Sequence, residues 1–316
     1  MTGPRTSNSS GQNVSFVKKV RELLQQYAIL QGRFAEEADQ HRNFLYKQRE
    51  EYDRISQTHG AGPLSGLRAF EIGCGQRPYR LLNLLSEGID VRGVELDRVV
   101  FRPTLGSFWE NLRDNGAERA LKTALRHLLF GKHEQAGMER IFGARLDALI
   151  RDAESRIARG NAADEALWPS GDLDFVYSED VFEHIPKDDL ERVCEILARR
   201  LSPNGVALIR PMVFTGIRGG HNVEWYNASE GKARRCPPWD HLLDRTHAAN
   251  TYLNELWLAD YRALLERHFD IVEETIANPN IGRWAMTPEL RVRLSKYPEE
   301  ELFSDRVRYI LRRKTG

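Results

Sequence analysis

Two glycines stand one residue apart directly after a short apolar stretch. Gly73 and Gly75 follow Ala69-Phe70-Glu71-Ile72, and Pro78 stands where a helix would begin. Glycine lets a backbone approach a ligand closely because it carries no Cβ. The spacing therefore predicts a strand, a tight ligand-binding turn and then a helix.

A carboxylate follows the next apolar stretch. Glu95 lies twenty residues after Gly75, at the end of the predicted strand Asp90–Leu96. A carboxylate can accept hydrogen bonds from two ribose hydroxyls at once. Pro78 lacks the N–H that a phosphate would need, and Glu71 adds negative charge beside the turn. The turn and Glu95 therefore indicate a nucleoside ligand that carries a cation rather than a pyrophosphate.

Histidines supply the candidate proton acceptors. His221 lies in a loop with glycines at 216, 219 and 220, which we expect to be mobile, and it is the first candidate base. His184, directly after Glu183, and His241 are the alternatives. An ordinary imidazole titrates near pH ~6.5, which suits a base at neutral pH. His184 packed beside a cofactor, or His221 in a plain surface loop, would explain the same residues.

Two further features of this region have two interpretations each. His241, Asp244 and His247 suggest a metal, but no carboxylate–histidine set has an established ligand spacing, so we predict no metal site. Trp225, Tyr226 and Trp239 flank the histidines. They suit stacking on a sugar or planar ring, or equally the core of a lid.

The elements that must position these residues alternate along the chain. The predicted strands are 68–72, 90–96, a short one near 156–158, 173–177, 206–209, 270–275 and 306–312, with helices at 78–85, 187–201 and 254–269. Strands joined by crossover helices form parallel sheets covered on both faces. The fold class is α/β, a doubly wound, mostly parallel seven-stranded Rossmann-like sheet.

Three segments depart from this alternation. Residues 1–14 are predicted to be a disordered tail, and 15–60 a helical extension whose apolar stripe packs on the main domain or joins two subunits of a homo-oligomer. Residues 61–316 form the main domain. Within it, 101–158 is predicted to be a helical cap insertion over the ligand side.

Composition narrows the partners and the compartment. Lys+Arg and Asp+Glu are 46 each in 316 residues, so nucleic acid is disfavoured as a partner. The three cysteines form no pair at motif spacing, and no apolar stretch is long enough to span a bilayer. We therefore expect a cytoplasmic protein without a membrane span.

The segment Glu71-Ile72-Gly73-Cys74-Gly75 resembles the first motif of class I S-adenosylmethionine-dependent methyltransferases, although Arg77 replaces a third glycine. Segments 174–176, 179–185 and 201–205 resemble later motifs of that family in the same order. The resemblance implies S-adenosyl-L-methionine as cofactor. Its implied cofactor-binding residues are Glu71, Gly73, Cys74, Gly75, Glu95, Leu96, Asn161, Ala162, Glu179 and His184.

The segments HNVEW and PPWDHLLD resemble bacterial methyltransferases that modify sugars and surface polysaccharides. This resemblance implies O-methylation of a carbohydrate or glycan hydroxyl. Three alternatives stay open: methylation of another small metabolite or a lipid, a Rossmann-like protein that binds a different nucleotide, and a non-catalytic cofactor-binding scaffold.

Overall fold

The computed structural model describes residues 37–101, 106, 109, 113, 135–226, 234–247, 249 and 251–314. The predicted tail, the first part of the helical extension and most of 102–134 lie outside these residues. None of the helices among the described residues combines the length and apolar character that crossing a bilayer requires.

A single sheet organises the chain, with the strand order β3-β2-β1-β4-β5-β7-β6. Its strands are β1 (Arg68–Ile72), β2 (Asp90–Glu95), β3 (Ile157–Arg159), β4 (Leu173–Glu179), β5 (Leu201–Arg210), β6 (Phe269–Ile276) and β7 (Val307–Arg313). The first five are parallel to one another, whereas β7 is antiparallel to both β5 and β6. The predicted seven-stranded α/β sheet is confirmed, and it is mixed rather than purely parallel.

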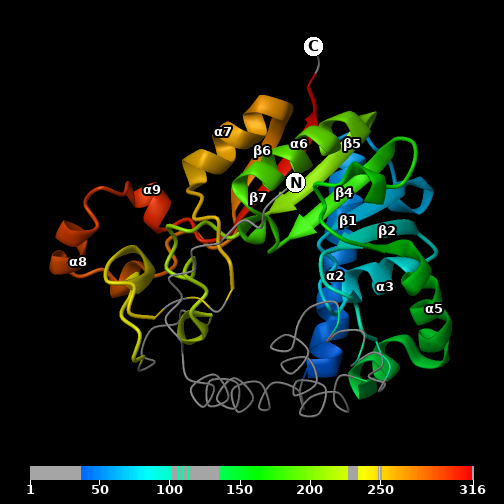
Figure 1. Cartoon of the computed structure of the whole chain (residues 1–316), viewed down its shortest axis with the longest axis horizontal. Helices are drawn as coiled ribbons and strands as arrows, with labels where there is room; N and C mark the ends of the chain where they lie inside the picture. The colour runs from blue at the N-terminus through cyan, green and yellow to red at the C-terminus, as the bar shows by residue number, and fades with distance from the viewer. Residues whose placement is uncertain are drawn as a thin grey trace, which may run out of the picture.

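Helices cover both faces of the sheet. The helices are α2 (Glu37–Thr58), α3 (Tyr79–Ser86), α5 (Leu146–Arg156), α6 (Lys187–Arg200), α7 (Leu258–His268), α8 (Pro288–Arg293) and α9 (Glu299–Leu302). Helices α2, α3 and α5 lie on one face, and α6 and α7 lie on the other (Figure 1). The two faces follow from strand alternation: Phe175 and Tyr177 of β4 join the core beneath α2, while Val176 joins the core beneath α6.

Helix α2 is a layer of the domain. Its apolar residues Leu45, Tyr52 and Ile55 are buried in the core that α3 and α5 share. The described part of the predicted helical extension therefore packs on the chain's own sheet. Assembly into a homo-oligomer through this region stays a prediction.

The predicted cap insertion divides in two. From residue 146 the chain forms α5, whose Leu149, Ile150 and Ala153 are buried against the sheet, and then β3, which pairs with β2. This C-terminal part of the range covers and extends the sheet. A cap over the ligand side would have to come from the remainder, and most of that lies outside the described residues.

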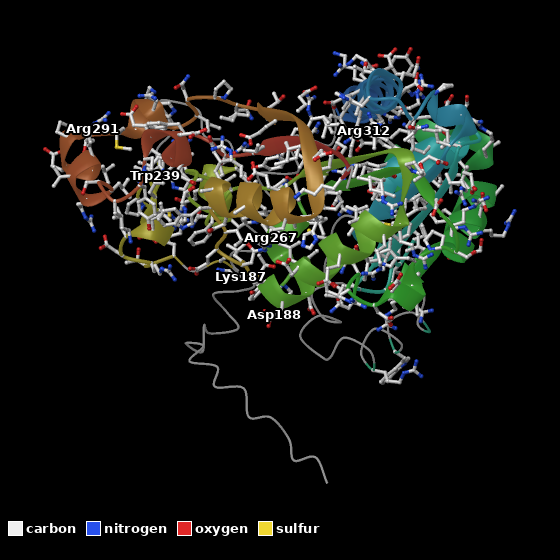
Figure 2. All side chains as sticks on the ribbon, turned by 90° about the horizontal axis from the view of Figure 1, so that it is seen from above. Lys187, Asp188, Trp239, Arg267, Arg291 and Arg312 are labelled. Carbon is white, nitrogen blue, oxygen red and sulfur yellow. The ribbon has the colours of Figure 1, made fainter. Side chains whose placement is uncertain are left out.

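A third core lies beyond the β7 and β6 edge. It combines the segment after β5 with α8, α9 and the chain around them; its buried members are Phe214, Ile217, Trp225, Cys236, Trp239, Leu242, Leu294, Tyr297, Leu302 and Phe303. Figure 2 shows Trp239 and Arg291 at the end of the molecule opposite the blue helix α2. No local sequence pattern predicts a helix or strand for this part of the C-terminal region.

Candidate cofactor and acceptor site

The glycine turn after β1 has the backbone that its sequence predicts. Gly73 and Gly75 have φ values of 75° and 70°, in the left-handed region that side chains disfavour. Among the residues that the structure describes, the nearest atom to a Cβ added at Gly75 would be the backbone nitrogen of Arg77, at 4.0 Å. The turn is thus a bare backbone surface that a ligand can approach.

Glu95 is fixed against this turn. Its Oε2 accepts a hydrogen bond from the Gly75 N–H at 2.6 Å, and its Oε1 accepts one from the Asp97 N–H at 3.2 Å. Burial raises the pKa of Glu95, while the two backbone amides act in the opposite direction. Each carboxylate oxygen retains a lone pair, so the side chain is pre-positioned to accept from neighbouring hydroxyls.

Two residues predicted to bind the cofactor, Cys74 and Leu96, have few polar side-chain groups to present to it. The Cys74 thiol is buried, with its Sγ 3.7 Å from the Val94 carbonyl oxygen, and the Cys74 N–H donates to the same oxygen at 3.4 Å. Leu96, directly after β2, is 60% exposed. Its side chain offers an apolar surface next to Glu95.

Asn161 and Ala162 lie at the same edge of the sheet as Glu95. The Gly160 N–H donates to the Glu95 carbonyl oxygen at 2.9 Å, which places this turn beside the end of β2. However, the Asn161 amide already donates to Asp189 at 2.9 Å, and its oxygen accepts from the backbone of the turn. Asn161 therefore braces the turn, and exchange of its partners would be needed before it could bind a ligand.

Glu71 carries less charge than the sequence suggests. It is almost completely buried; its Oε2 accepts a hydrogen bond from the Tyr177 hydroxyl at 3.1 Å, and Arg80 lies 3.8 Å from its Oε1. Burial raises the pKa of Glu71 from 4.5 to about 7, against the opposing effect of Arg80. The folded chain therefore favours the protonated form of this carboxyl more than water does.

The side chain of Glu179 bonds to helix α2 and the end of β5. Its Oε1 accepts from the side chains of Gln48 (2.7 Å) and Tyr52 on α2. Its Oε2 accepts from Arg210 at 3.0 Å, and Arg80 lies 3.9 Å away. Burial alone would raise the pKa of Glu179, but the two arginines and the hydrogen bonds hold it below its ordinary value. Glu179, which was predicted to bind the cofactor, therefore connects helix α2 to strands β4 and β5 through its side-chain hydrogen bonds.

The turn after β4 contacts the glycine turn directly. Val181 packs against Gly73 so closely that a Cβ at position 73 would meet its methyl carbons at 2.5 Å. The Val181 carbonyl oxygen in turn accepts the His184 N–H at 2.8 Å. Position 73 therefore requires glycine, because a side chain there would overlap Val181. The same contact places the residues around 183 beside the turn that is proposed to bind the cofactor.

Glu183, His184 and His221 meet at this point, although 37 residues separate the two histidines. One donor atom from each lies within 4.8 Å of the others. His221 Nε2 is 3.9 Å from Glu183 Oε1, and the two imidazole rings meet edge to face at 4.8 Å. The backbones of His221 (φ 51°) and of nearby Asp180 (φ 57°) both lie in the left-handed region, where non-glycine residues are uncommon and cluster at functional sites.

Several buried polar atoms of this cluster have no hydrogen-bond partner among the described residues. They are both carboxylate oxygens of Glu183, Nε2 of His221 and Oδ1 of Asp180. Burial, with the negative charge of Asp180, raises the pKa of Glu183 to about 8. Burial, with the neighbouring histidines and Arg306, lowers the pKa of His221 to about 4. At neutral pH the imidazole is therefore neutral. The same burial disfavours its protonated form, so His221 is a weaker base than the imidazole titrating near pH ~6.5 that the sequence analysis expected.

The loop that carries His221 is tightly packed, contrary to the mobility expected from its glycines. A Cβ at Gly219 would lie 2.1 Å from the Phe214 carbonyl oxygen, and one at Gly220 would lie 2.4 Å from the His241 ring. Arg218 forms an ion pair with the fully buried Asp305. These glycines permit close contact, and the loop holds His221 in a defined place.

The His241 side chain packs against the loop that carries His221 and holds it by a hydrogen bond. Its Nε2 lies 2.8 Å from the Phe214 carbonyl oxygen, to which it must donate because a carbonyl only accepts. Trp225 and Trp239 are buried in the third core. Tyr226 is 47% exposed, and its ring centroid lies 6.5 Å from that of His221. Of the three aromatic residues, Tyr226 is the one that can contact an acceptor.

Sequence reasoning missed the residues that brace the cluster. The Asn254 side chain donates to the carbonyl oxygens of Phe182 (2.7 Å) and Ile185 (3.0 Å), on either side of the Glu183–His184 pair. The buried Glu301 accepts from the backbone at the start of α7 and from Thr215. Each of these two side chains lies more than 40 positions in sequence from the groups it binds, so no local sequence pattern could have identified it.

No protein-family model and no curated protein matches this chain. Among solved structures, it is similar to a TehB-like SAM-dependent methyltransferase from Corynebacterium glutamicum, with 14% identity, a TM-score of 0.41, and coverage of 90% of this chain and 99% of that chain. It is also similar to a SAM-dependent methyltransferase from Archaeoglobus fulgidus, with 14% identity, a TM-score of 0.44 and the same coverage. A third is geranyl diphosphate C-methyltransferase from Streptomyces coelicolor A3(2), with 12% identity, a TM-score of 0.42, and coverage of 85% and 76%.

Proposed function

We propose that this protein is an S-adenosyl-L-methionine-dependent O-methyltransferase that acts on a small-molecule or glycan hydroxyl. The observation that carries the proposal is the contact of Val181 with Gly73. It sets a nucleoside-type turn directly beside a buried histidine–carboxylate cluster. A methyl donor and a group that activates an acceptor must lie next to each other in this way.

The cofactor side fits S-adenosylmethionine by the chemistry of its residues. The open surface at Gly75 accommodates a close ligand, and Glu95 is held with its oxygens directed along the turn. Glu71, 1% exposed and held by Tyr177 and Arg80, adds negative charge behind the turn when it is ionised, which a cationic ligand would favour. When bound, S-adenosylmethionine supplies the methyl group and a sulfonium that leaves as a neutral thioether.

The acceptor side supplies a proton acceptor. His221 is a neutral imidazole at pH 7, and its Nε2 has no partner among the described residues. Transfer forms an O–C bond on the acceptor and breaks the S–C bond, whose electron pair stays on sulfur. The hydroxyl proton goes to His221 Nε2, an effect worth about 10²–10⁴ in rate.

A carbohydrate is the acceptor class that we favour. Tyr226 offers an exposed aromatic ring beside His221, and an aromatic ring suits the apolar face of a sugar.

The test is the His221→Ala variant, assayed by release of S-adenosylhomocysteine with a panel of sugars and sugar nucleotides. We expect kcat to fall about 10²–10⁴-fold while the cofactor Kd stays within about twofold. His247→Ala, a change outside the cluster, is the matched control and should keep wild-type kcat. If His221→Ala keeps its kcat while His184→Ala or His241→Ala loses it, the assignment of the base is wrong.

A further inference from the structure

We propose that Glu183, His184 and His221 bind one divalent transition-metal ion of the Zn²⁺ type. One donor atom from each residue already lies within 4.8 Å of the others, and Glu183 Oε1 is 3.9 Å from His221 Nε2. A small contraction brings such a set to the spacing of ligands around one ion. Binding rests on this cluster alone, whereas any role of the ion in activating a hydroxyl rests on the proposed function.

The buried carboxylate is the second observation. Glu183 is only 3% exposed, and neither of its oxygens makes a hydrogen bond of normal geometry with the described residues, although the backbone N–H groups of Glu183 and Met212 lie close enough to favour its ionised form. Buried polar groups are nearly always paired, and buried carboxylates are paired or bound to metals. His221 Nε2, also buried and without a partner in the same part of the structure, lies next to it. A cation between them would satisfy both groups.

The surroundings of His184 match those of a metal ligand. Its Nδ1 lies 2.9 Å from the Tyr252 carbonyl oxygen, and because a carbonyl only accepts, Nδ1 carries the proton. Nε2 therefore carries the lone pair. Histidine ligands of metals almost always donate their other N–H in this way. Asn254 holds the backbone on both sides of the Glu183–His184 pair, so two of the three ligands are rigidly placed.

The donor set indicates the kind of metal. Two imidazoles and one carboxylate suit Zn²⁺ or a related transition metal, whereas Mg²⁺ and Ca²⁺ prefer oxygen ligands. Three protein ligands leave a coordination position open for water or a hydroxyl, as in catalytic zinc sites.

A second group of metal-binding side chains, Cys236, Asp240 and His247, serves as a comparison. Both oxygens of Asp240 are already satisfied, Oδ1 by the Thr246 hydroxyl at 2.6 Å and Oδ2 by the His247 N–H at 2.8 Å. Burial raises the pKa of Cys236 to about 11, which keeps the thiol protonated. Internal hydrogen bonds explain this group without a metal.

The ion would change the role of His221. The single lone pair of Nε2 can hold a proton or a metal, but not both. Held by these three residues, the ion would act as a Lewis acid and would lower the pKa of an acceptor hydroxyl at its open position, so that the proton would pass to water and not to His221. The sulfonium S–C bond then breaks with its electron pair on sulfur, as without the metal.

The test begins with protein stripped by a chelator and dialysed. Co²⁺ is titrated in while its visible absorption is recorded, and Zn²⁺ is titrated by calorimetry. We expect one ion per chain, with affinity about 100-fold weaker or undetectable in Glu183→Gln and His221→Ala. His247→Ala should bind like the wild type. Absence of binding to wild-type protein, unchanged binding in both cluster variants, or loss in His247→Ala would overturn the proposal.

Two further measurements separate folding and function from metal binding. Zn²⁺ should raise the Tm of the wild type and His247→Ala but not of His221→Ala, whose own Tm shows whether that variant is folded. S-adenosylhomocysteine is also titrated into the metal-free protein. If it fails to bind while Co²⁺ binds as expected, the proposed function is wrong and the metal site stands; the reverse result overturns only the metal site.

Discussion

Two acidic residues of the glycine turn have different environments and so different uses. Glu95 accepts two backbone hydrogen bonds that hold it facing the turn. Glu71 is buried between Tyr177 and Arg80, where it binds a proton more tightly than a free glutamate does. Residue type and spacing identified both positions, but Tyr177 stands 106 positions from Glu71, so the sequence could not show which of them is charged.

The raised pKa of Glu71 predicts a pH-dependent stability. Its pKa is about 7 in the folded chain and near 4.5 when unfolded, so the folded state binds the extra proton between these values. This contribution is fully present below pH 4.5 and is lost as the pH rises through 7, in total about 3 kcal/mol. Glu71→Gln keeps an acceptor for Tyr177 and removes the titration.

Urea unfolding of both proteins between pH 4.5 and 8.5 measures the effect. The variant should gain about 3 kcal/mol of unfolding free energy relative to the wild type over this range. Curves that stay parallel across the whole range would show that Glu71 titrates normally.

At the scale of elements, the strands and crossover helices were predictable because each has its own local pattern. β1 was predicted with its observed bounds, and α6 was misplaced by one residue at its end. The third core was not predictable in this way. Its short helices α8 and α9 have too few residues for an apolar period, and its buried aromatic residues come from segments that are far apart in sequence.

Helix α2 should contribute to stability through one buried hydroxyl. Tyr52 donates to Glu179, and its ring packs on Phe175 and Tyr177. Tyr52→Phe keeps the ring but removes a donor to a buried carboxylate, so we expect a loss of about 1–3 kcal/mol in unfolding free energy. Tyr46→Phe, on the same helix but 53% exposed, should change it by less than about 0.5 kcal/mol. Equal effects of the two substitutions in chemical denaturation would contradict this account of α2.

At the scale of the whole molecule, the parallel strands bring the site together. The turns after β1, β2 and β3 meet around Glu95, and the turn after β4 lies between them and the segment after β5 that carries His221. Carboxyl ends of parallel strands share one edge, so the glycine turn and Glu95 could be placed from sequence. The Glu183–His184–His221 cluster could not, because it depends on how the loop after β5 folds back through Arg218 and Asp305.

The most direct test of the central claim is a calorimetric titration of S-adenosylmethionine into the wild type and into Glu95→Ala. We predict one site per chain with a Kd in the micromolar range, and a loss of about 1.5–3 kcal/mol in Glu95→Ala because charge-assisted hydrogen bonds are removed. Glu154→Ala, an exposed change on α5, should bind like the wild type. No binding at millimolar cofactor, or an unchanged Kd in Glu95→Ala, would contradict the assignment of this edge as a methyl-donor site.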